Sequence, residues 1–185
     1  ENMTTKVDRS VERHYMERWD IQPVDVEAYR QGKLTEPVKP IVFYLDPNFP
    51  KAWRAHVAQG VLDWNKAFEA IGFKNAIQVK DYPTNEPEFD PDNMKYNTIR
   101  YVPTGVVTMM KDASWVDPRN GEIRNASLFL FHDLLKWNNI QRFVQTSQVD
   151  EGARHLKLSD ELQGESIRAA VRHEIGHTLG LINNM

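Results

Sequence analysis

The run Pro40-Ile41-Val42-Phe43-Tyr44-Leu45-Asp46-Pro47 lies between prolines and is apolar, β-branched and aromatic, which is typical of a buried β-strand. From Pro50, a favoured first residue of helices, apolar side chains recur every three or four residues as far as Gly72. Residues 76–80 and 97–102 have the composition of two further strands. A strand, a helix and a strand in this order predict a βαβ unit, and therefore an α/β fold.

A turn organises the segment that follows these strands. The sequence Asp117-Pro118-Arg119-Asn120-Gly121 favours a tight turn, so we expect a hairpin whose second arm, residues 122–131, is an edge strand. Residues 134–144 are expected to be helical. We expect the final helix to begin near Ser159 or Glu165, both of which precede a region of helical composition.

The end of the chain carries the residues with the clearest chemistry. It reads Val171-Arg172-His173-Glu174-Ile175-Gly176-His177-Thr178-Leu179-Gly180-Leu181, which contains H-E-x-x-H followed by x-x-G. Residues four apart lie on one face of a helix, so His173 and His177 can bind one Zn²⁺ ion. Glu174 adjoins the first ligand, where its carboxylate can act as the general base that takes a proton from the attacking water. The spacing therefore predicts a zinc hydrolase site.

The residues after the motif give a candidate for a third ligand. Gly180 follows the expected helix end near Thr178 and allows the chain to leave the helix in a left-handed turn. In sites of this kind such a turn returns a third ligand to the metal from three residues further on, and that position is Asn183.

Chance does not account well for the motif. With 6 His and 13 Glu among 185 residues, about 0.01 matches to H-E-x-x-H are expected at random. Gly180 and the helical character of the segment make the match more specific. The other histidines stand at no ligand spacing, although His132 follows the expected edge strand and would lie near a cleft; these residues are His14, His56, His132 and His155. The aromatic positions Trp53, Trp64 and Phe68 share one helix face and are predicted to be core.

Composition narrows the possible partners. The chain has 23 Lys and Arg against 26 Asp and Glu, a formal charge of −3, which lacks the basic excess of a nucleic-acid-binding protein, so we expect no nucleic acid partner. No apolar run approaches the roughly 20 residues that span a bilayer, and we expect no membrane contact by this chain.

The length of the chain predicts one domain. The absence of Cys excludes disulfides without fixing the compartment.

The terminal sequence H-E-I-G-H-T-L-G-L resembles the metzincin clan of zinc peptidases. Other phrases along the chain resemble the catalytic domain of a family of large bacterial exported zinc-dependent metalloproteases. These phrases are residues 17–21, 60–68, 97–101 and 117–123.

Residues 1–39 are rich in charge and poor in regular period, apart from a short helix expected over residues 11–19, and we interpret them as a lead-in that packs on the domain. The resemblance implies that residues 40–185 form an N-terminal subdomain. Such a subdomain has a twisted mixed sheet with an antiparallel edge strand, a backing helix and an active-site helix. It also implies a peptide or protein substrate and an extracellular, periplasmic or outer-membrane-associated protein. An edge strand at 122–131 would hold an extended peptide by backbone hydrogen bonds, through Ala126, Ser127, Leu128 and Phe129.

Two departures from the family pattern keep alternatives open. Asn183 stands where metzincins place a third His, and an amide oxygen is a poorer zinc ligand than imidazole. The chain also ends at Met185, before the smaller subdomain of such enzymes, so we expect it to be a fragment of a longer protein. The leading hypothesis is a zinc endopeptidase, although the fragment itself could be inactive. The alternatives are a peptide-binding pseudoenzyme, or a zinc hydrolase whose third ligand is a later Glu or Asp.

Overall fold

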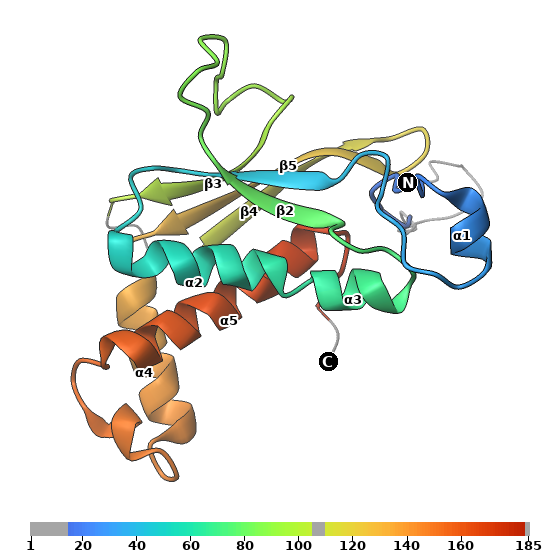
Figure 1. The fold of residues 1–185 in the computed structure, drawn as a ribbon. Coiled ribbons are helices and arrows are strands. Elements are labelled where there is room, and N and C mark those ends of the chain that lie inside the picture. Colours follow the sequence, from blue (N-terminus) through green and yellow to red (C-terminus); the bar gives the residue numbers. More distant parts are fainter. Residues whose placement is uncertain (1–14, 105–109, 184–185) are drawn as a thin grey trace, which may run out of the picture.

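The computed structural model describes residues 15–104 and 110–183, which form one five-stranded sheet with helices against it (Figure 1). In chain order the elements are α1 (Val26–Arg30), β1 (Ile41–Leu45), α2 (Lys51–Leu62), α3 (Asn65–Ala70), β2 (Ile77–Asp81), β3 (Asn97–Val102), β4 (Met110–Asp117), β5 (Glu122–Phe131), α4 (Leu134–Thr146), the 3-10 helix η1 (Glu151–Arg154) and α5 (Asp160–Thr178).

The sheet is mixed and has the strand order β2-β1-β3-β5-β4. Strand β1 runs parallel to β2 and β3, and β3 runs parallel to β5. Only β4 among these strands is antiparallel, and it lies at one edge. The predicted fold class, a mixed α/β sheet with an antiparallel edge strand, is confirmed.

The predicted position of residues 122–131 at the edge is wrong. This segment is β5, an inner strand, and Ser127 faces Thr98 of β3 on one side and Ala113 of β4 on the other. Ala126 and Leu128 are fully buried and lie on the face of β5 that packs into the core. The hairpin turn is where the sequence predicted it, but its first arm, β4, is the outer one.

Helices α2 and α5 lie against the same face of the sheet (Figure 1) and enclose the core with it. The two helices approach so closely that a Cβ at Gly60 would lie 2.7 Å from the carbonyl oxygen of Arg168. The core is built from fully buried side chains of β1, β3, β5, α2 and α5, among them Phe43, Val57, Val61, Ile99, Leu128, Leu130, Ile167, Val171 and Ile175.

The single helix predicted between Pro50 and Gly72 is two helices. Helix α2 ends at Leu62 and α3 begins at Asn65. The side chain of Asn65 accepts a hydrogen bond from the backbone N–H of Ile77 at 3.1 Å and donates to its carbonyl at 2.9 Å. These bonds tie the start of α3 to β2, so tertiary contacts set the break that helical periodicity did not show.

The described part of the lead-in packs against the sheet. The short helix expected over residues 11–19 is wrong for residues 15–19, which are not helical, and residues 11–14 lie outside the described residues. Arg18 donates its N–H to the Gly121 carbonyl at 2.9 Å and accepts from the N–H of Ile123 at 2.8 Å. Residues 15–19 therefore extend along the start of β5. The division into a lead-in and a subdomain stays a prediction.

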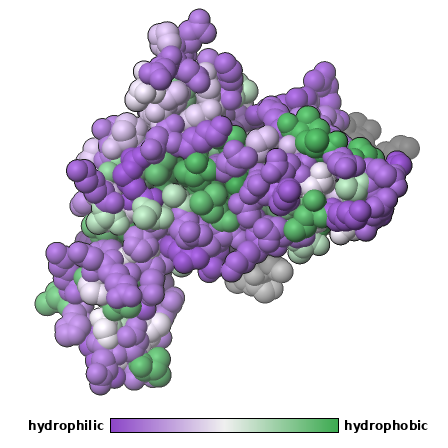
Figure 2. All heavy atoms as spheres, viewed as in Figure 1, coloured by the Kyte–Doolittle hydropathy of each residue, from purple (hydrophilic) through white to green (hydrophobic). Residues whose placement is uncertain are grey.

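Helix α4 and the segment after it form a lobe that projects from the sheet (Figure 1). Figure 2 shows apolar side chains at the surface of this lobe, among side chains that are mainly hydrophilic. Phe143 and Val144 of α4 are exposed, as is Leu156 after η1. Within the two described stretches, no helix combines the length and apolar character needed to cross a membrane.

Candidate metal centre

Helix α5 forms where the sequence predicted the final helix. Ser159 is its N-cap, and the Ser159 hydroxyl accepts a hydrogen bond from the N–H of Leu162 at 3.3 Å. Its fully buried face includes Ile167, Val171 and Ile175. The two histidines of the motif lie away from that buried face, because the helical period separates them from it.

His173 and His177 point their ring nitrogens at one another. The two Nε2 atoms are 3.2 Å apart, and the ring centroids are 4.8 Å apart. Tetrahedral zinc with bonds of about 2.0–2.1 Å to imidazole nitrogen requires two ligand nitrogens about 3.3–3.4 Å apart. The separation and the ligand type both fit zinc. His173 is exposed and His177 is half-buried, so the pair is open to solvent.

The turn after α5 orients His177. Gly180 has φ +93°, the Gly180 N–H donates to the His177 carbonyl, and the Leu181 N–H donates to the Gly176 carbonyl. These two bonds are the Schellman arrangement that the predicted left-handed turn implies. The same turn brings the Leu181 carbonyl 2.9 Å from Nδ1 of His177. Since a carbonyl can only accept, Nδ1 carries the proton and Nε2 keeps the lone pair that a metal needs.

Glu174 lies beside the pair in a half-buried position. Burial raises the pKa of its carboxyl group. Electrostatic interaction with His173 and His177 acts in the opposite direction and lowers the pKa of Glu174, whereas interaction with Asp112 on β4 raises it further. A carboxylate with a raised pKa holds a proton more strongly, which suits a group that takes a proton during a reaction and then releases it.

A hollow of about 360 Å³ adjoins Glu174. It lies between α5, the beginning of β4 and helix α4. Apolar side chains and the amides of Asn138 and Gln141 line it together with two motif residues; the complete lining is Met110, Leu134, Asn138, Gln141, Ala170, His173 and Glu174. Sequence reasoning missed the contribution of α4, since nothing in the spacing of its residues indicates that it borders the motif.

The predicted third-ligand position follows the turn after α5. Asn183 lies in irregular backbone after the turn, with an exposed side chain. Within residues 15–104 and 110–183, no third His, Cys, Asp or Glu joins the histidine pair in a metal-binding group. The role of Asn183 as a ligand stays a prediction.

The four residues predicted to bind substrate are Ala126, Ser127, Leu128 and Phe129, and all lie on β5. Because β5 pairs with β3 and β4, its backbone groups have partners on both sides and cannot add a further strand. The hydroxyl of Ser127 lies 3.2 Å from that of Thr98. The predicted mode of binding, backbone pairing at an edge, is therefore wrong for these residues, and the edge strand next to β5 is β4.

Two of the other described histidines make contacts outside the motif. Nδ1 of His132 lies 2.7 Å from the hydroxyl of Tyr101, and its ring stacks on Trp53 with centroids 5.8 Å apart. His56 packs against Gly164 in the interface of α2 and α5. His132 thus belongs to an aromatic cluster, and His14 lies outside the described residues.

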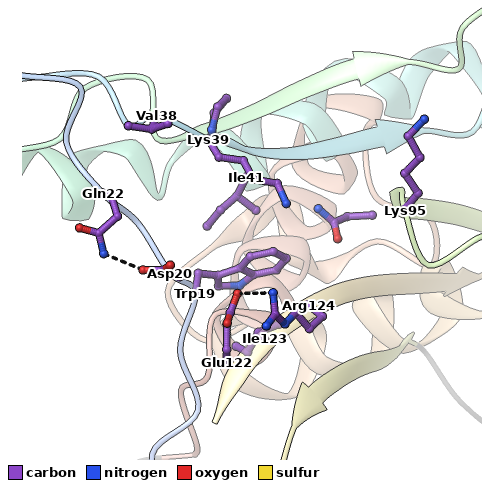
Figure 3. A pocket seen from close by; sticks show the side chains of 12 residues that line it. Trp19, Asp20, Gln22, Val38, Lys39, Ile41, Lys95, Glu122, Ile123 and Arg124 are labelled. Carbon is purple, nitrogen blue, oxygen red and sulfur yellow. Dashed lines mark hydrogen bonds and ion pairs between the residues drawn. The ribbon is translucent and has the colours of Figure 1, made fainter. Parts of the chain in front are cut away.

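A second hollow of about 340 Å³ lies between the lead-in and the first residues of β1, β3 and β5 (Figure 3). The charged residues that line it are of both signs, and two of them, Glu122 and Arg124, form an ion pair at 2.9 Å. None of the H-E-x-x-H residues lines it. We assign it no part in the chemistry of the motif.

A protein-family model matches the end of the chain. The model of a protein family described as Met-zincin matches residues 155–185, which include α5, the histidine pair and the turn after them. This match supports a metzincin-type relationship for that stretch, and in general terms a zinc metallopeptidase site. No curated protein and no solved structure matches the chain.

Proposed function

We propose that the chain is the metal-binding part of a zinc-dependent endopeptidase, with His173 and His177 as ligands and Glu174 as general base. The observation that carries the proposal is the convergence of two imidazole Nε2 atoms, 3.2 Å apart, next to a half-buried carboxyl group. The Met-zincin match over residues 155–185 supports the same reading. Of the functions considered, only hydrolysis assisted by a metal uses all three residues in distinct roles.

The roles of the residues follow from their chemistry. Bound zinc would polarise the scissile carbonyl and make the attacking water more acidic. Glu174 accepts the proton that this water loses on attack, and then gives it to the leaving amine nitrogen. The Leu181 carbonyl keeps Nδ1 of His177 protonated, so that the lone pair of His177 stays on Nε2.

We place the substrate along β4. This strand is at the edge of the sheet, and its position between β5 and solvent leaves one side for an extended peptide. Asp112 of β4 acts electrostatically on Glu174, which supports a location of the strand beside the reacting groups. The hollow next to Glu174 is large enough to receive a substrate side chain.

The proposed partner is a peptide or protein rather than nucleic acid, in keeping with the formal charge of −3. We also propose an extracellular or periplasmic setting, or association with an outer membrane. This part rests on the resemblance to exported metalloproteases.

The second candidate function is a peptide-binding pseudoenzyme. The amide of Asn183 at the third-ligand position favours it, because amide oxygen binds zinc more weakly than imidazole. In this alternative the β4 edge and the hollow would still bind peptide, but Glu174 would have no metal-activated water to deprotonate.

Hydrolysis of a quenched fluorescent peptide library with added zinc separates the two candidates. The proposal predicts cleavage that Glu174→Gln abolishes while zinc binding persists. Cleavage that survives Glu174→Gln would refute the assigned base. If the chain binds peptides without cleaving them, and Asn183→His restores cleavage, the pseudoenzyme reading holds instead.

A further inference from the structure

Two tryptophan side chains hold the backbone of α5 immediately before and after the H-E-x-x-H motif. Nε1 of Trp64 donates to the carbonyl of Arg172 at 2.8 Å, and Nε1 of Trp19 donates to the carbonyl of Thr178 at 2.9 Å. Arg172 directly precedes His173, and Thr178 directly follows His177. The donors come from segments 108 and 159 residues away in the sequence.

The Trp64 ring also explains a residue inside the motif. A Cβ on Gly176 would lie 2.9 Å from Cζ2 of Trp64, so only glycine lets the indole lie this close to the helix. Trp64 stands in the break between α2 and α3, next to Asp63. The carboxylate of Asp63 accepts two hydrogen bonds from Arg168, at 2.8 and 2.6 Å. The break therefore contacts α5 at Arg168, Arg172 and Gly176, along one side of the helix.

Trp19 acts at the opposite end of the motif. The Thr178 carbonyl belongs to the last turn of α5, where carbonyl groups have no partner within the helix. Trp19 supplies a donor there, and its own backbone is held because neighbouring Arg18 pairs with Gly121 and Ile123. This contact ties the C-terminal end of α5 to the hairpin that carries the edge strand β4.

We infer that Trp64 and Trp19 are positioning residues that set the rotation of α5 and hence the direction of the two metal-ligating nitrogens. The buried face of α5 sets its general orientation on the sheet, and hydrogen-bond donors on both sides of the motif hold the backbone of the motif residues more closely. Both indoles act through the backbone, since neither is a candidate ligand. The inference rests on the proposed function, because it concerns His173 and His177 as ligands.

The test is the zinc dissociation constant of the 185-residue chain, measured by competition with a chelating dye, for wild type, Trp64→Phe and Trp19→Phe. Removing a group that hydrogen-bonds directly to a metal ligand typically weakens binding about 10- to 100-fold, and because the two indoles act through the backbone we expect the lower end, about tenfold, for each variant. Trp53→Phe is the matched control. Trp53 is a half-buried tryptophan on α2 whose ring packs on Tyr101 and His132.

The visible absorption of Co²⁺ bound in place of Zn²⁺ reports the geometry of the ligands, and a loss of stability alone would not change it. Replacing Trp64 should alter the visible absorption bands of bound Co²⁺, because these bands report ligand geometry, while Trp53→Phe should leave them unchanged. Thermal unfolding of the metal-free chains measures the separate effect of each substitution on stability.

Each outcome decides between the proposals. Weaker zinc binding by Trp64→Phe and Trp19→Phe, with Trp53→Phe like wild type, supports the inference. Wild-type affinity and cobalt spectra in both variants would overturn it while leaving the zinc site itself intact. If wild type binds no zinc, or if His173→Ala binds it equally well, the proposed function fails and the inference fails with it.

Discussion

Replacing Gly180 with alanine should destabilise the chain through two separable effects. The first is conformational, since Gly180 has φ +93°, and an L-residue in the left-handed region costs about 1–2 kcal/mol. The second is steric, because a Cβ there would lie 2.3 Å from the carbonyl oxygen of Glu17. That oxygen belongs to the backbone, so the lead-in must move, at about 1–3 kcal/mol for an overpacked contact. We expect the free energy of unfolding to fall by about 2–5 kcal/mol in total.

Gly32→Ala is the control that separates these effects. Gly32 has φ +74°, and a Cβ on it would meet nothing within 4 Å. This variant should lose only the conformational part, about 1–2 kcal/mol. Urea unfolding of the metal-free chains, followed by tryptophan fluorescence, gives both values. If Gly180→Ala costs no more than Gly32→Ala, the lead-in does not pack on the turn after α5, and the reasoning is refuted.

Three further predictions concern α5. Ile175→Ala removes a fully buried side chain of the motif helix and should cost about 2–5 kcal/mol in urea unfolding; a cost under 1 kcal/mol would contradict the packing of α5 on the sheet. Ser159→Ala removes the N-cap bond to Leu162 and should cost about 0.5–2 kcal/mol, seen as a lower thermal midpoint. Hydrogen bonds from Arg168 hold the pKa of Asp63 below its usual value, so its folded pKa lies below its unfolded one. The stability that ionised Asp63 contributes is complete above about pH 4 and is lost as the pH falls through the folded pKa. The difference in unfolding free energy between wild type and Asp63→Asn should therefore shrink below pH 4, and a difference constant from pH 7 to pH 2 would exclude this role.

Local sequence patterns predicted most of the elements but not all of their neighbours, and they missed α1 and the break between α2 and α3. The strand at Ile41–Leu45 and the turn before β5 were predictable, because composition and turn residues act over a few positions. Whether a strand is inner or outer depends on distant segments. One signal was available for β5, since edge strands commonly carry charged side chains and Leu128-Phe129-Leu130-Phe131 has none.

The motif shows the same division between local and distant information. A spacing of four on a helix was enough to predict that His173 and His177 face one another, and Gly180 predicted the left-handed turn. Helical periodicity predicted that Trp64 packs inward, but it cannot say where an indole N–H points. The contacts that hold the motif were therefore not readable from the sequence.

The zinc content of the chain after metal-free purification and repletion with zinc tests the central claim most directly. Elemental analysis should find about one zinc per chain in wild type and in Glu174→Gln, and none in His173→Ala or His177→Ala, because the two imidazoles are the ligands and the carboxylate is not. Zinc retained at the wild-type level in both histidine variants would contradict the assignment of the metal site.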